Sequence, residues 1–471
     1  MPDIALALAA AMSRAQAGGG EVSGLRQLSG GASMESWLFS FGGREMVLRR
    51  MPAGANEQDR AANVADISLA AQADLIELAR KHGVTAPEVL MRLTAGDGLG
   101  AGFVMAKAEG ETLPHKILGK SDFALAETRL TGQCAREMAA IHAIDPADVS
   151  PEIVQVKAAD LLTKLEQGYR EQNAHIPVFD YALGWLERNL PEPVEPCLVH
   201  ADFRMGNLMI DADGITAVLD WELAHLGDPL EDLAYLCTPS WRFGHYEKEA
   251  GGFDSAENLI AAYQKAGGVE FDQARFDWWL IYSTLWWGVT CLRMGNSYRD
   301  GTVHTLERTV IGRRVSEVEI DLLLQFETKR NADGRTLDWD QPALLPDEGE
   351  PAYQEMLNAL IEWNKDKIIP AAEGHSLFEA RVAKNALGIA QRFAAWGQNF
   401  AMRQSGRFAG LGLTGSGLTS EQLCTRLRDG RADLTDEAIW DHLRLTALER
   451  LAIDQPKYAG LRVAREKWIR K

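Results

Sequence analysis

The chain has 471 residues, of which 46% are hydrophobic and 25% charged, a composition typical of folded globular proteins rather than of disordered chains. Its formal net charge of -18 argues against a general nucleic-acid binder, because such proteins need an excess of clustered Lys and Arg. Since one hydrophobic core rarely organises so long a chain, the length favours two or three domains.

The cysteines and the apolar segments argue against export and membrane insertion. The five cysteines are scattered without CxxC spacing, which fits neither a disulfide framework nor a zinc site. The Ala-rich start resembles a signal sequence, but Asp3 stands where such signals carry positive charge, so we expect a short helix. The apolar run at 278–292 is too short to span a bilayer. We therefore expect a cytoplasmic protein that binds neither membrane nor nucleic acid.

The region 25–110 is predicted to form a small β-rich lobe. Aromatic residues alternate with other side chains from Trp37 to Phe41, Gly42-Gly43 supplies a two-residue turn, and residues 46–49 return as a second strand. This pattern predicts a β-hairpin. A loop of small residues precedes the hairpin and includes Gly30, Gly31 and Ser33.

A helix and two further strands complete the predicted lobe. Apolar side chains recur every three or four residues between 61 and 82, and Gly83 follows as a stop signal, which predicts a helix. Short apolar runs at 89–91 and 103–105 predict strands. The segment 106–110 then leads out of the lobe as a linker.

The region 111–330 is predicted to form a larger, mainly helical lobe. Three short apolar segments interrupt the helical periodicity and predict strands, at 197–200, 208–210 and 217–220. A turn rich in Asp and Gly at 211–214 joins the last two. These strands surround the polar residues of greatest interest.

Residues 331–350 are predicted to be a linker, because they combine prolines and acids with little periodicity. Helical periodicity resumes in 351–471, which we expect to form an all-α domain. Every catalytic motif precedes the linker, so this domain is expected to be separable from catalysis. The alternatives are that it covers the substrate cleft or forms an oligomer interface.

Three polar residues carry the predicted chemistry. Asp202 and Asn207 stand five residues apart in one short loop, and Asp220 ends the last of the three strands. Phosphoryl transfer needs a carboxylate that accepts the proton of the attacking hydroxyl, together with oxygen ligands for magnesium. The order suits Asp202 as catalytic base and Asn207 and Asp220 as metal ligands. Asp and Asn are also common in turns, but this ordered set behind a small-residue loop favours phosphoryl transfer.

The segments 200–207 and 219–221 resemble the signature of the aminoglycoside phosphotransferase and choline kinase-like family, in which His-x-Asp-x-x-x-x-Asn is followed by a strand ending in Asp-Trp. The resemblance implies an α+β, protein-kinase-like fold with a small β-rich N-lobe and a larger helical C-lobe, followed by the all-α domain. It also implies ATP and Mg²⁺ as cofactors. We interpret His200 as a brace of the catalytic loop and Asp232 as a tie between that loop and the following helix.

Five residues of this chain match positions that contact the nucleotide in the family. The resemblance implies that Gly30, Gly31 and Ser33 let backbone amides approach the phosphates. It also implies that the adenine edge meets the backbone near Lys107 and Ala108.

Arg49 departs from the family pattern. It takes the position at which these kinases use Lys on the α- and β-phosphates, and Arg can serve there with a planar, forked geometry. The helix partner of that cation, usually Glu, aligns with Gln72, which cannot form an ion pair. Glu77 or Glu57 is the expected substitute.

The sequences of residues 47–50 and 311–319 resemble one branch of the family, which is associated with acyl-CoA dehydrogenases. Members of this branch are linked to phosphorylating hydroxyacyl-CoAs. Residues 353–471 resemble a helical domain of unknown function found with such kinases. We therefore expect an ATP-dependent kinase for a hydroxyl of a small molecule, such as a hydroxyacyl-CoA. The CoA phosphates would meet a group of arginines, namely Arg293, Arg299, Arg308, Arg313 and Arg314.

Two other classes of function remain open. One is an antibiotic kinase for aminoglycosides or macrolides, and a polycationic aminoglycoside would need a cluster of carboxylates near Asp202. The other is a nucleotide-binding pseudokinase that uses its C-terminal domain for protein contacts. The complete set of Asp202, Asn207 and Asp220 disfavours the pseudokinase.

Overall fold

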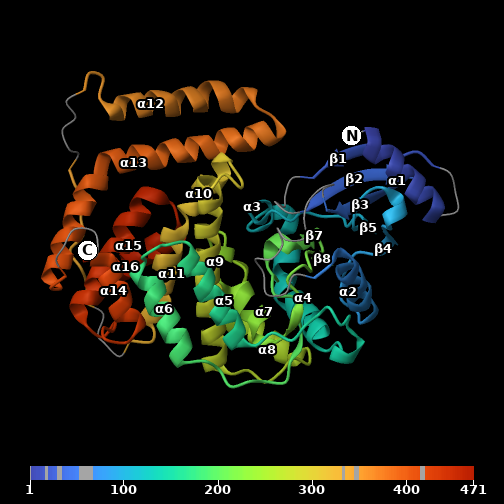
Figure 1. The fold of residues 1–471 in the computed structure, drawn as a ribbon, viewed down its shortest axis with the longest axis horizontal. Helices are drawn as coiled ribbons and strands as arrows, with labels where there is room; N and C mark the ends of the chain where they lie inside the picture. The colour runs from blue at the N-terminus through green and yellow to red at the C-terminus, as the bar shows by residue number, and fades with distance from the viewer. Residues whose placement is uncertain are drawn as a thin grey trace. The chain divides into compact units, whose positions relative to one another are not determined.

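The computed structural model describes residues 2–15, 20–28, 34–51, 67–330, 335–343, 349–413 and 419–470. The chain forms two compact units (Figure 1). The first comprises Met1–Leu161 and Pro191–Leu280, and the second comprises Leu162–Leu190 and Ile281–Lys471. These units cut across the expected bounds of 25–110, 111–330, 331–350 and 351–471, which stay predictions about independently folding parts.

A five-stranded antiparallel sheet with the order β1-β2-β3-β5-β4 begins the first unit. Positive φ angles of 59° at Gly42 and 81° at Gly43 close the β2–β3 hairpin, as a two-residue turn between twisted strands requires. The predicted β-rich lobe is confirmed. Its strands are β1 (Ser23–Gln27), β2 (Glu35–Phe41), β3 (Arg44–Arg50), β4 (Val89–Arg92) and β5 (Gly102–Ala106).

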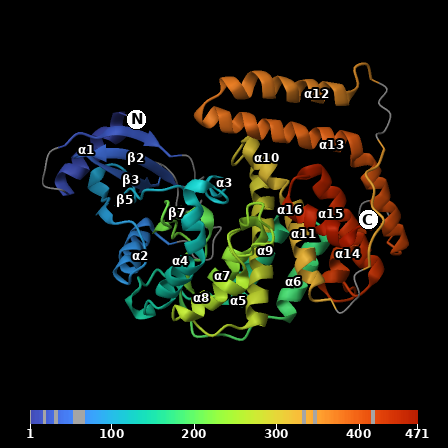
Figure 2. The ribbon, with the colours of Figure 1, turned by 180° about the vertical axis from the view of Figure 1, so that it is seen from behind.

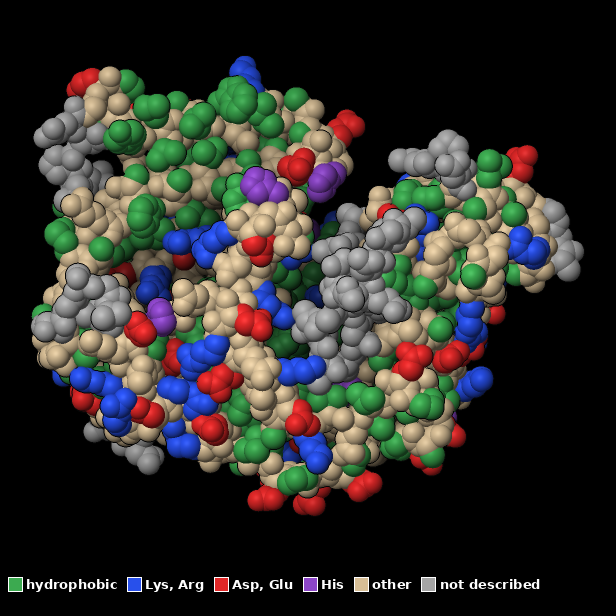
Figure 3. All heavy atoms as spheres, viewed as in Figure 1, with side chains coloured by type: hydrophobic (Ala, Val, Ile, Leu, Met, Phe, Trp, Pro, Cys, Tyr) green, Lys and Arg blue, Asp and Glu red, His purple; other side chains and the backbone are tan. Residues whose placement is uncertain are grey.

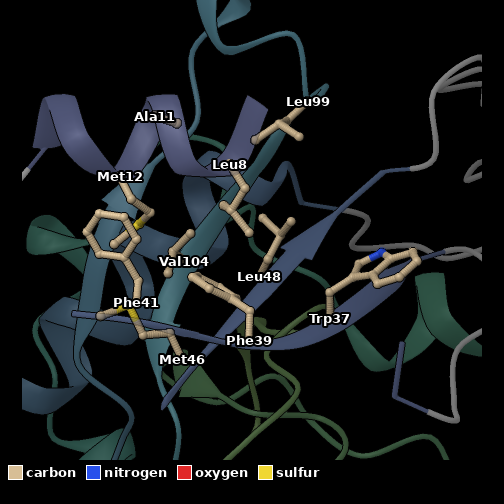
Figure 4. Close-up of a cluster of buried hydrophobic side chains, with 10 residues drawn as sticks. All are labelled: Leu8, Ala11, Met12, Trp37, Phe39, Phe41, Met46, Leu48, Leu99 and Val104. Atoms are coloured by element: carbon tan, nitrogen blue, oxygen red, sulfur yellow. The ribbon is translucent and has the colours of Figure 1, made fainter. Parts of the chain in front are cut away.

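Helix α1 (Pro2–Ala15) contributes to the core of this lobe (Figure 4). Leu8 and Met12 of α1 have no exposed surface, and they belong to the same buried cluster as Phe39 of β2 and Leu48 of β3. Alternate strand residues point to this face, because side chains along a strand have a period of two. The Ala-rich start is therefore a helix, as its composition predicted.

Helix α2 (Leu69–Lys81) follows the hairpin. Ser68 caps it by accepting a hydrogen bond from the N–H of Ala71 at 3.1 Å, and Gly83 with a φ of 85° follows its end, as a helix stop requires. The helix predicted over 61–82 is observed from Leu69 onward, and residues 61–66 lie outside the described part of the chain.

The remainder of the first unit supplies the loops that matter for function. Strands β6 and β9 pair with each other, and β7 and β8 form a second small hairpin. None of the helices in the described ranges is long and apolar enough to cross a lipid bilayer. The elements are α3 (Pro114–Ile117), α4 (Ala124–His142), β6 (Cys197–Val199), β7 (Leu208–Ile210), β8 (Ile215–Val218), β9 (His225–Gly227), α7 (Leu230–Cys237) and α8 (Ala256–Lys265).

The long regular elements in the described part of the second unit are helices. In both ribbon views α12 runs beside α13 as an antiparallel hairpin (Figures 1 and 2). Two of the unit's helices, α5 and α9, begin in the first unit and continue into the second. The helices are α5 (Ala158–Glu171), α6 (Pro177–Arg188), α9 (Gln273–Arg299), α10 (Leu306–Gly312), α11 (Val315–Glu327), α12 (Tyr353–Trp363), α13 (Gly374–Gly410), α14 (Thr419–Arg428), α15 (Glu437–Asp454) and α16 (Ala459–Trp468).

Polar contacts join the helices after the predicted linker to helices before it. Arg450 of α15 pairs with Glu319 of α11 at 2.7 Å, and the hydroxyl of Tyr458 donates to Asp321 at 2.7 Å. Glu319 and Asp321 are both buried, and a buried carboxylate needs a partner. These contacts argue against a C-terminal region that folds apart from α11, whereas its separability from catalysis stays a prediction.

The Arg450–Glu319 pair supplies a test of this coupling. We expect Arg450→Met to lower the free energy of unfolding by about 2 kcal/mol or more at pH 7, because Glu319 would be left buried without its partner. Burial already raises the pKa of Glu319. A carboxyl whose pKa is higher in the folded state favours folding as the pH falls, so the deficit should shrink towards pH 5.

Chemical denaturation at both pH values measures this effect. The matched control is Arg462→Met, which breaks an exposed pair with Glu466 within α16 and should cost no more than about 0.5 kcal/mol. Equal losses for the two variants would show that the Glu319 contact contributes nothing special.

Candidate active site

One buried carboxylate, that of Asp232, anchors the loop after β6. Asp232 of α7 accepts hydrogen bonds from the backbone N–H of His200 at 2.8 Å and of Ala201 at 2.7 Å. His142 of α4 lies 3.0 Å from the same carboxylate. Burial alone would raise the pKa of Asp232, but His142 and the loop hold it below its usual value. The carboxylate therefore stays charged and fixes the start of the loop, as the sequence suggested for Asp232.

His200 braces the same loop through both ring nitrogens. Its Nδ1 lies 3.3 Å from the backbone N–H of Asp202, which can only donate, so Nε2 carries the proton and donates to the carbonyl of Leu219 at 3.0 Å. The imidazole has no exposed surface. These contacts confirm that His200 braces the loop, as the sequence suggested.

The carboxylate of Asp202 is oriented by three donors. Its Oδ1 accepts from Arg204 Nε at 3.0 Å, and its Oδ2 accepts from Asn207 Nδ2 at 2.5 Å. The hydroxyl of Tyr235 also donates to it, and burial together with the charge of Asp202 raises the pKa of Tyr235 well above its usual value. Arg204 lies over the ring of Trp241, 4.8 Å from its centroid. Asp202 is thus fixed by these contacts, and its side chain is still 12% exposed.

Asn207 and Asp220 are brought together by the β7–β8 hairpin. Leu208 pairs with Val218 in the strands, and the N–H of Leu219 donates to the carbonyl of Asn207 at 2.8 Å. The side-chain amide of Asn207 donates to the backbone carbonyl of Asp202 at 2.9 Å as well as to its carboxylate. Its amide nitrogen is therefore committed, and its side-chain oxygen is the atom suited to a cation.

Two residues of the site have left-handed backbone conformations. Ala201 has a φ of 61°, and Asp220 has a φ of 66°. Such conformations cost free energy for residues other than glycine, and they persist where surrounding contacts over-determine the backbone. Here the loop anchored by Asp232 and the hairpin contact of Asn207 supply those constraints.

Arg49 of β3 reaches the same site, but its partners differ from the expected ones. Its Nη2 lies 2.6 Å from Oδ1 of Asp220 and 2.9 Å from Oε2 of Glu222. Gln72 is buried and donates to the carbonyl of Ile67 instead, and Glu77 pairs with Arg92 at 2.8 Å. The expectation of Glu77 as the partner is therefore wrong, because Arg92 of β4 lies nearer to it on the exposed face of α2. Glu57 lies outside the described residues.

Of the other residues predicted to bind the nucleotide, Lys107 and Ala108 fall within the described residues. Gly30, Gly31 and Ser33 lie outside the described residues. Lys107 pairs with Glu45 at 2.7 Å and with Glu109 at 3.1 Å, so its ammonium serves the surface of the lobe. Ala108 is partly buried in the segment that follows β5.

That segment is tied to the catalytic half of the unit. Glu111 and Ile210 exchange backbone hydrogen bonds at 2.8 and 3.0 Å, and the hydroxyl of Thr216 donates to the carbonyl of Glu109 at 2.6 Å. These hydrogen bonds fix the connection between the two lobes to the β7–β8 hairpin, which is flanked by Asn207 and Asp220.

The set of oxygen donors fits a magnesium ion that is shared with a ligand. In the described ranges, no group of three or more His, Cys, Asp or Glu side chains could enclose a metal. Magnesium is commonly held by one or two protein oxygens together with phosphates and water. The Asn207 oxygen and the Asp220 carboxylate match that pattern.

Comparison with known proteins identifies the first unit. The model of the phosphotransferase enzyme family matches residues 24–279. The chain belongs to this family. A second family model, a domain of unknown function named DUF6285, matches residues 370–458.

The curated relatives that the chain matches are much longer. Acyl-CoA dehydrogenase family member 11 of Rattus norvegicus is 34% identical over 132 residues, which are 26% of this chain and 17% of that protein. Family member 10 of Mus musculus is 27% identical over 221 residues, or 45% of this chain and 20% of that protein. The chain thus matches about a fifth of the length of these relatives.

A solved structure shows the same fold. It is a Ralstonia eutropha protein provisionally named an aminoglycoside phosphotransferase, with a TM-score of 0.56 and 21% identity. The match covers 68% of this phosphotransferase-family chain and 98% of the other. The predicted kinase-like fold with a helical C-terminal region is confirmed.

Three residues that hold the site were missed by sequence reasoning: Arg204, Glu222 and Tyr235. Arg204 lies inside the motif, two residues after Asp202, and Glu222 lies two residues after Asp220. Tyr235 stands three residues after Asp232, a spacing that places both on one side of α7. The spacing could have signalled Tyr235, whereas the contacts of Glu222 with β3 have no signal in the local sequence.

Proposed function

We propose that the protein is an ATP-dependent kinase that transfers the γ-phosphate to a hydroxyl of a small molecule. The observation that carries the proposal is the gathering of Asp202, Asn207 and Asp220 in one site, with the Asp202 carboxylate fixed by three donors. Family membership supports phosphoryl transfer. The nature of the nucleotide and the acceptor belongs to the proposal.

Asp202 acts as the catalytic base. Its carboxylate orients the acceptor hydroxyl and accepts the hydroxyl proton as the oxygen bonds to the γ-phosphorus and the bond to ADP breaks. The contacts from Arg204 and Asn207 keep the carboxylate in one rotamer. Such fixation lowers the entropy that must be lost when reactants are aligned.

Asn207 and Asp220 would hold a magnesium ion through their side-chain oxygens. When bound, Mg²⁺ would neutralise charge on the nucleotide phosphates. Arg49 provides a second positive group for the phosphates, and Glu222 holds it from the same strand end as Asp220. Glu222 thus does for Arg49 what a helix glutamate does for lysine in protein kinases.

A hydroxyacyl-CoA is the proposed acceptor, and the support is the similarity to acyl-CoA dehydrogenase family members 10 and 11. The group of arginines expected to bind CoA gives less support than composition suggested. Arg313 pairs with Asp454, its Nε lying 2.7 Å from the carboxylate, and Arg314 pairs with Glu317 at 2.9 Å. These two guanidinium groups serve the helical core of the second unit.

The role of Asp202 predicts the behaviour of Asp202→Asn. We expect this variant to fold and bind ATP like the wild type but to turn over about two to four decades more slowly, the usual contribution of a positioned base. Single-turnover kinetics and ATP titration measure the two properties. The matched control is Asp211→Asn in the β7–β8 turn, and a wild-type rate in Asp202→Asn would exclude the base assignment.

The role of Glu222 predicts a separate effect on the nucleotide. Glu222→Gln should raise the KM for ATP several-fold and change kcat little, because it loosens Arg49 without touching Asp202. Glu88→Gln, which breaks an exposed pair with Arg44, is the control. If Glu222→Gln left the KM for ATP unchanged while Arg49→Ala raised it, Asp220 alone would position Arg49.

The acceptor is tested by ADP release with ATP, magnesium and either 4-hydroxyvaleryl-CoA or kanamycin. Our proposal expects phosphorylation of the thioester and none of kanamycin. Phosphorylation of kanamycin alone would replace the acyl-CoA with an antibiotic acceptor. Magnesium-dependent nucleotide binding without transfer to any hydroxyl compound would favour a pseudokinase.

A further inference from the structure

Helix α12 (Tyr353–Trp363) exposes an unusual amount of apolar surface. None of its eleven residues is buried. Four large apolar side chains are exposed along it, with exposed fractions of 71% for Tyr353, 51% for Met356, 46% for Leu360 and 55% for Trp363. The space-filling view shows hydrophobic side chains gathered over this helix (Figure 3). We call these four residues the α12 stripe.

The spacing places the α12 stripe on one side of the helix. Its members are three, four and three residues apart, the spacing of an a/d seam. The adjoining side carries Leu357 and Ile361, which are partly buried, and α13 packs along α12. With about 100° per residue, the combined apolar arc spans roughly 160°. In the described part of the chain α13 packs along α12 and leaves the four stripe side chains exposed.

Charge separates two candidate occupants of the stripe, a lipid surface and another protein surface. A helix that lies on an anionic membrane carries Lys and Arg along its polar edge. The charged residues within α12 are Glu355 and Glu362, and the lysines Lys365 and Lys367 lie in the π-helical turn Asn364–Ile368 that continues it. This arrangement disfavours the membrane.

We propose that the α12 stripe pairs with the same stripe of a second copy in an antiparallel, two-fold symmetric homodimer. In that arrangement Trp363 meets the partner's Tyr353, and Met356 meets the partner's Leu360, so the stripe is complementary to itself. The antiparallel direction also aligns the helix dipoles favourably.

The size of the stripe is sufficient for a specific but modest interface. Its four side chains expose on the order of 500 Å² in each copy, given about 150–250 Å² for a large aromatic side chain. Two copies would therefore bury about 1,000 Å², the lower bound of specific interfaces. Contiguous exposed apolar patches of several hundred Å² mark interaction sites in soluble proteins.

The oligomeric state of the full chain tests the proposal. Light scattering after size exclusion should give roughly twice the chain mass of 51.9 kDa for the wild type at micromolar concentration. Leu360→Glu and Met356→Glu should each give the mass of one chain with an unchanged helical circular dichroism spectrum, because each places a charge in the apolar contact. Lys365→Glu, which adds the same side chain beyond the stripe, should stay dimeric.

Two outcomes would overturn the proposal. One is a wild-type chain that stays monomeric up to about 50 µM, and the other is a dimer that survives both stripe variants, which would place the interface elsewhere. Turnover should be unchanged in all three variants, so a failure here is distinct from a failure of the kinase assignment.

Cross-linking tests the direction of the pairing. A mixture of Tyr353→Cys and Trp363→Cys chains should form an intermolecular disulfide on mild oxidation, whereas neither variant should do so alone, because equal ends lie about 15 Å apart in an antiparallel pair. A disulfide formed by Tyr353→Cys alone would indicate parallel helices and overturn the two-fold antiparallel arrangement.

Discussion

The contacts of one buried carboxylate position the rest of the site. Asp232 has no exposed surface, and it accepts two backbone N–H groups from the loop that precedes the catalytic residue. A neutral side chain could not satisfy both donors and His142 with the same strength, because hydrogen bonds to a charged acceptor are about twice as strong as neutral ones. The loop is therefore fixed to α7 directly and to α4 through His142. Ala201 can keep its left-handed backbone conformation for this reason.

The second constraint is the short β7–β8 hairpin. Its pairing sets the distance between Asn207, just before β7, and Asp220, just after β8. His200 joins the two constraints, since its ring connects the backbone of Asp202 to the carbonyl of Leu219. Three segments that are separate in the chain thus form one rigid frame, and their functional side chains need little reorganisation to act together.

The parts of this site that the sequence predicted are those fixed by short-range geometry. Asp202 and Asn207 lie within one loop, and Asp220 ends a strand of the adjoining hairpin, so spacing alone located them. The partners of Arg49 could not be found in this way, because Asp220 and Glu222 lie more than 170 residues away along the chain. In the described part of α2 no glutamate pairs with Arg49, and Glu222 from another element takes that place.

Domain organisation shows the same limit of local signals. The described residues 335–343 of the predicted linker are not helical, yet α11 before it and α15 after it share the Glu319–Arg450 pair. Composition indicates the local structure of a segment by itself. The buried acids Glu319 and Asp321 require polar partners from other segments of the chain. A charged side chain on an expected core face is the available sequence signal for such coupling.

The electrostatic balance around Arg49 explains why two carboxylates are needed. If Asp220 were its single partner, a cation taking the Asp220 oxygen would leave a guanidinium that is only 14% exposed without a counter-charge, which is costly. Glu222 keeps that counter-charge in place. The group of Arg49, Asp220 and Glu222 carries one net negative formal charge, and the formal charge of Asp202 is balanced by Arg204. The site therefore attracts a divalent cation while it retains a fixed positive group for phosphate, and both properties depend on a residue that lies outside the recognised motif.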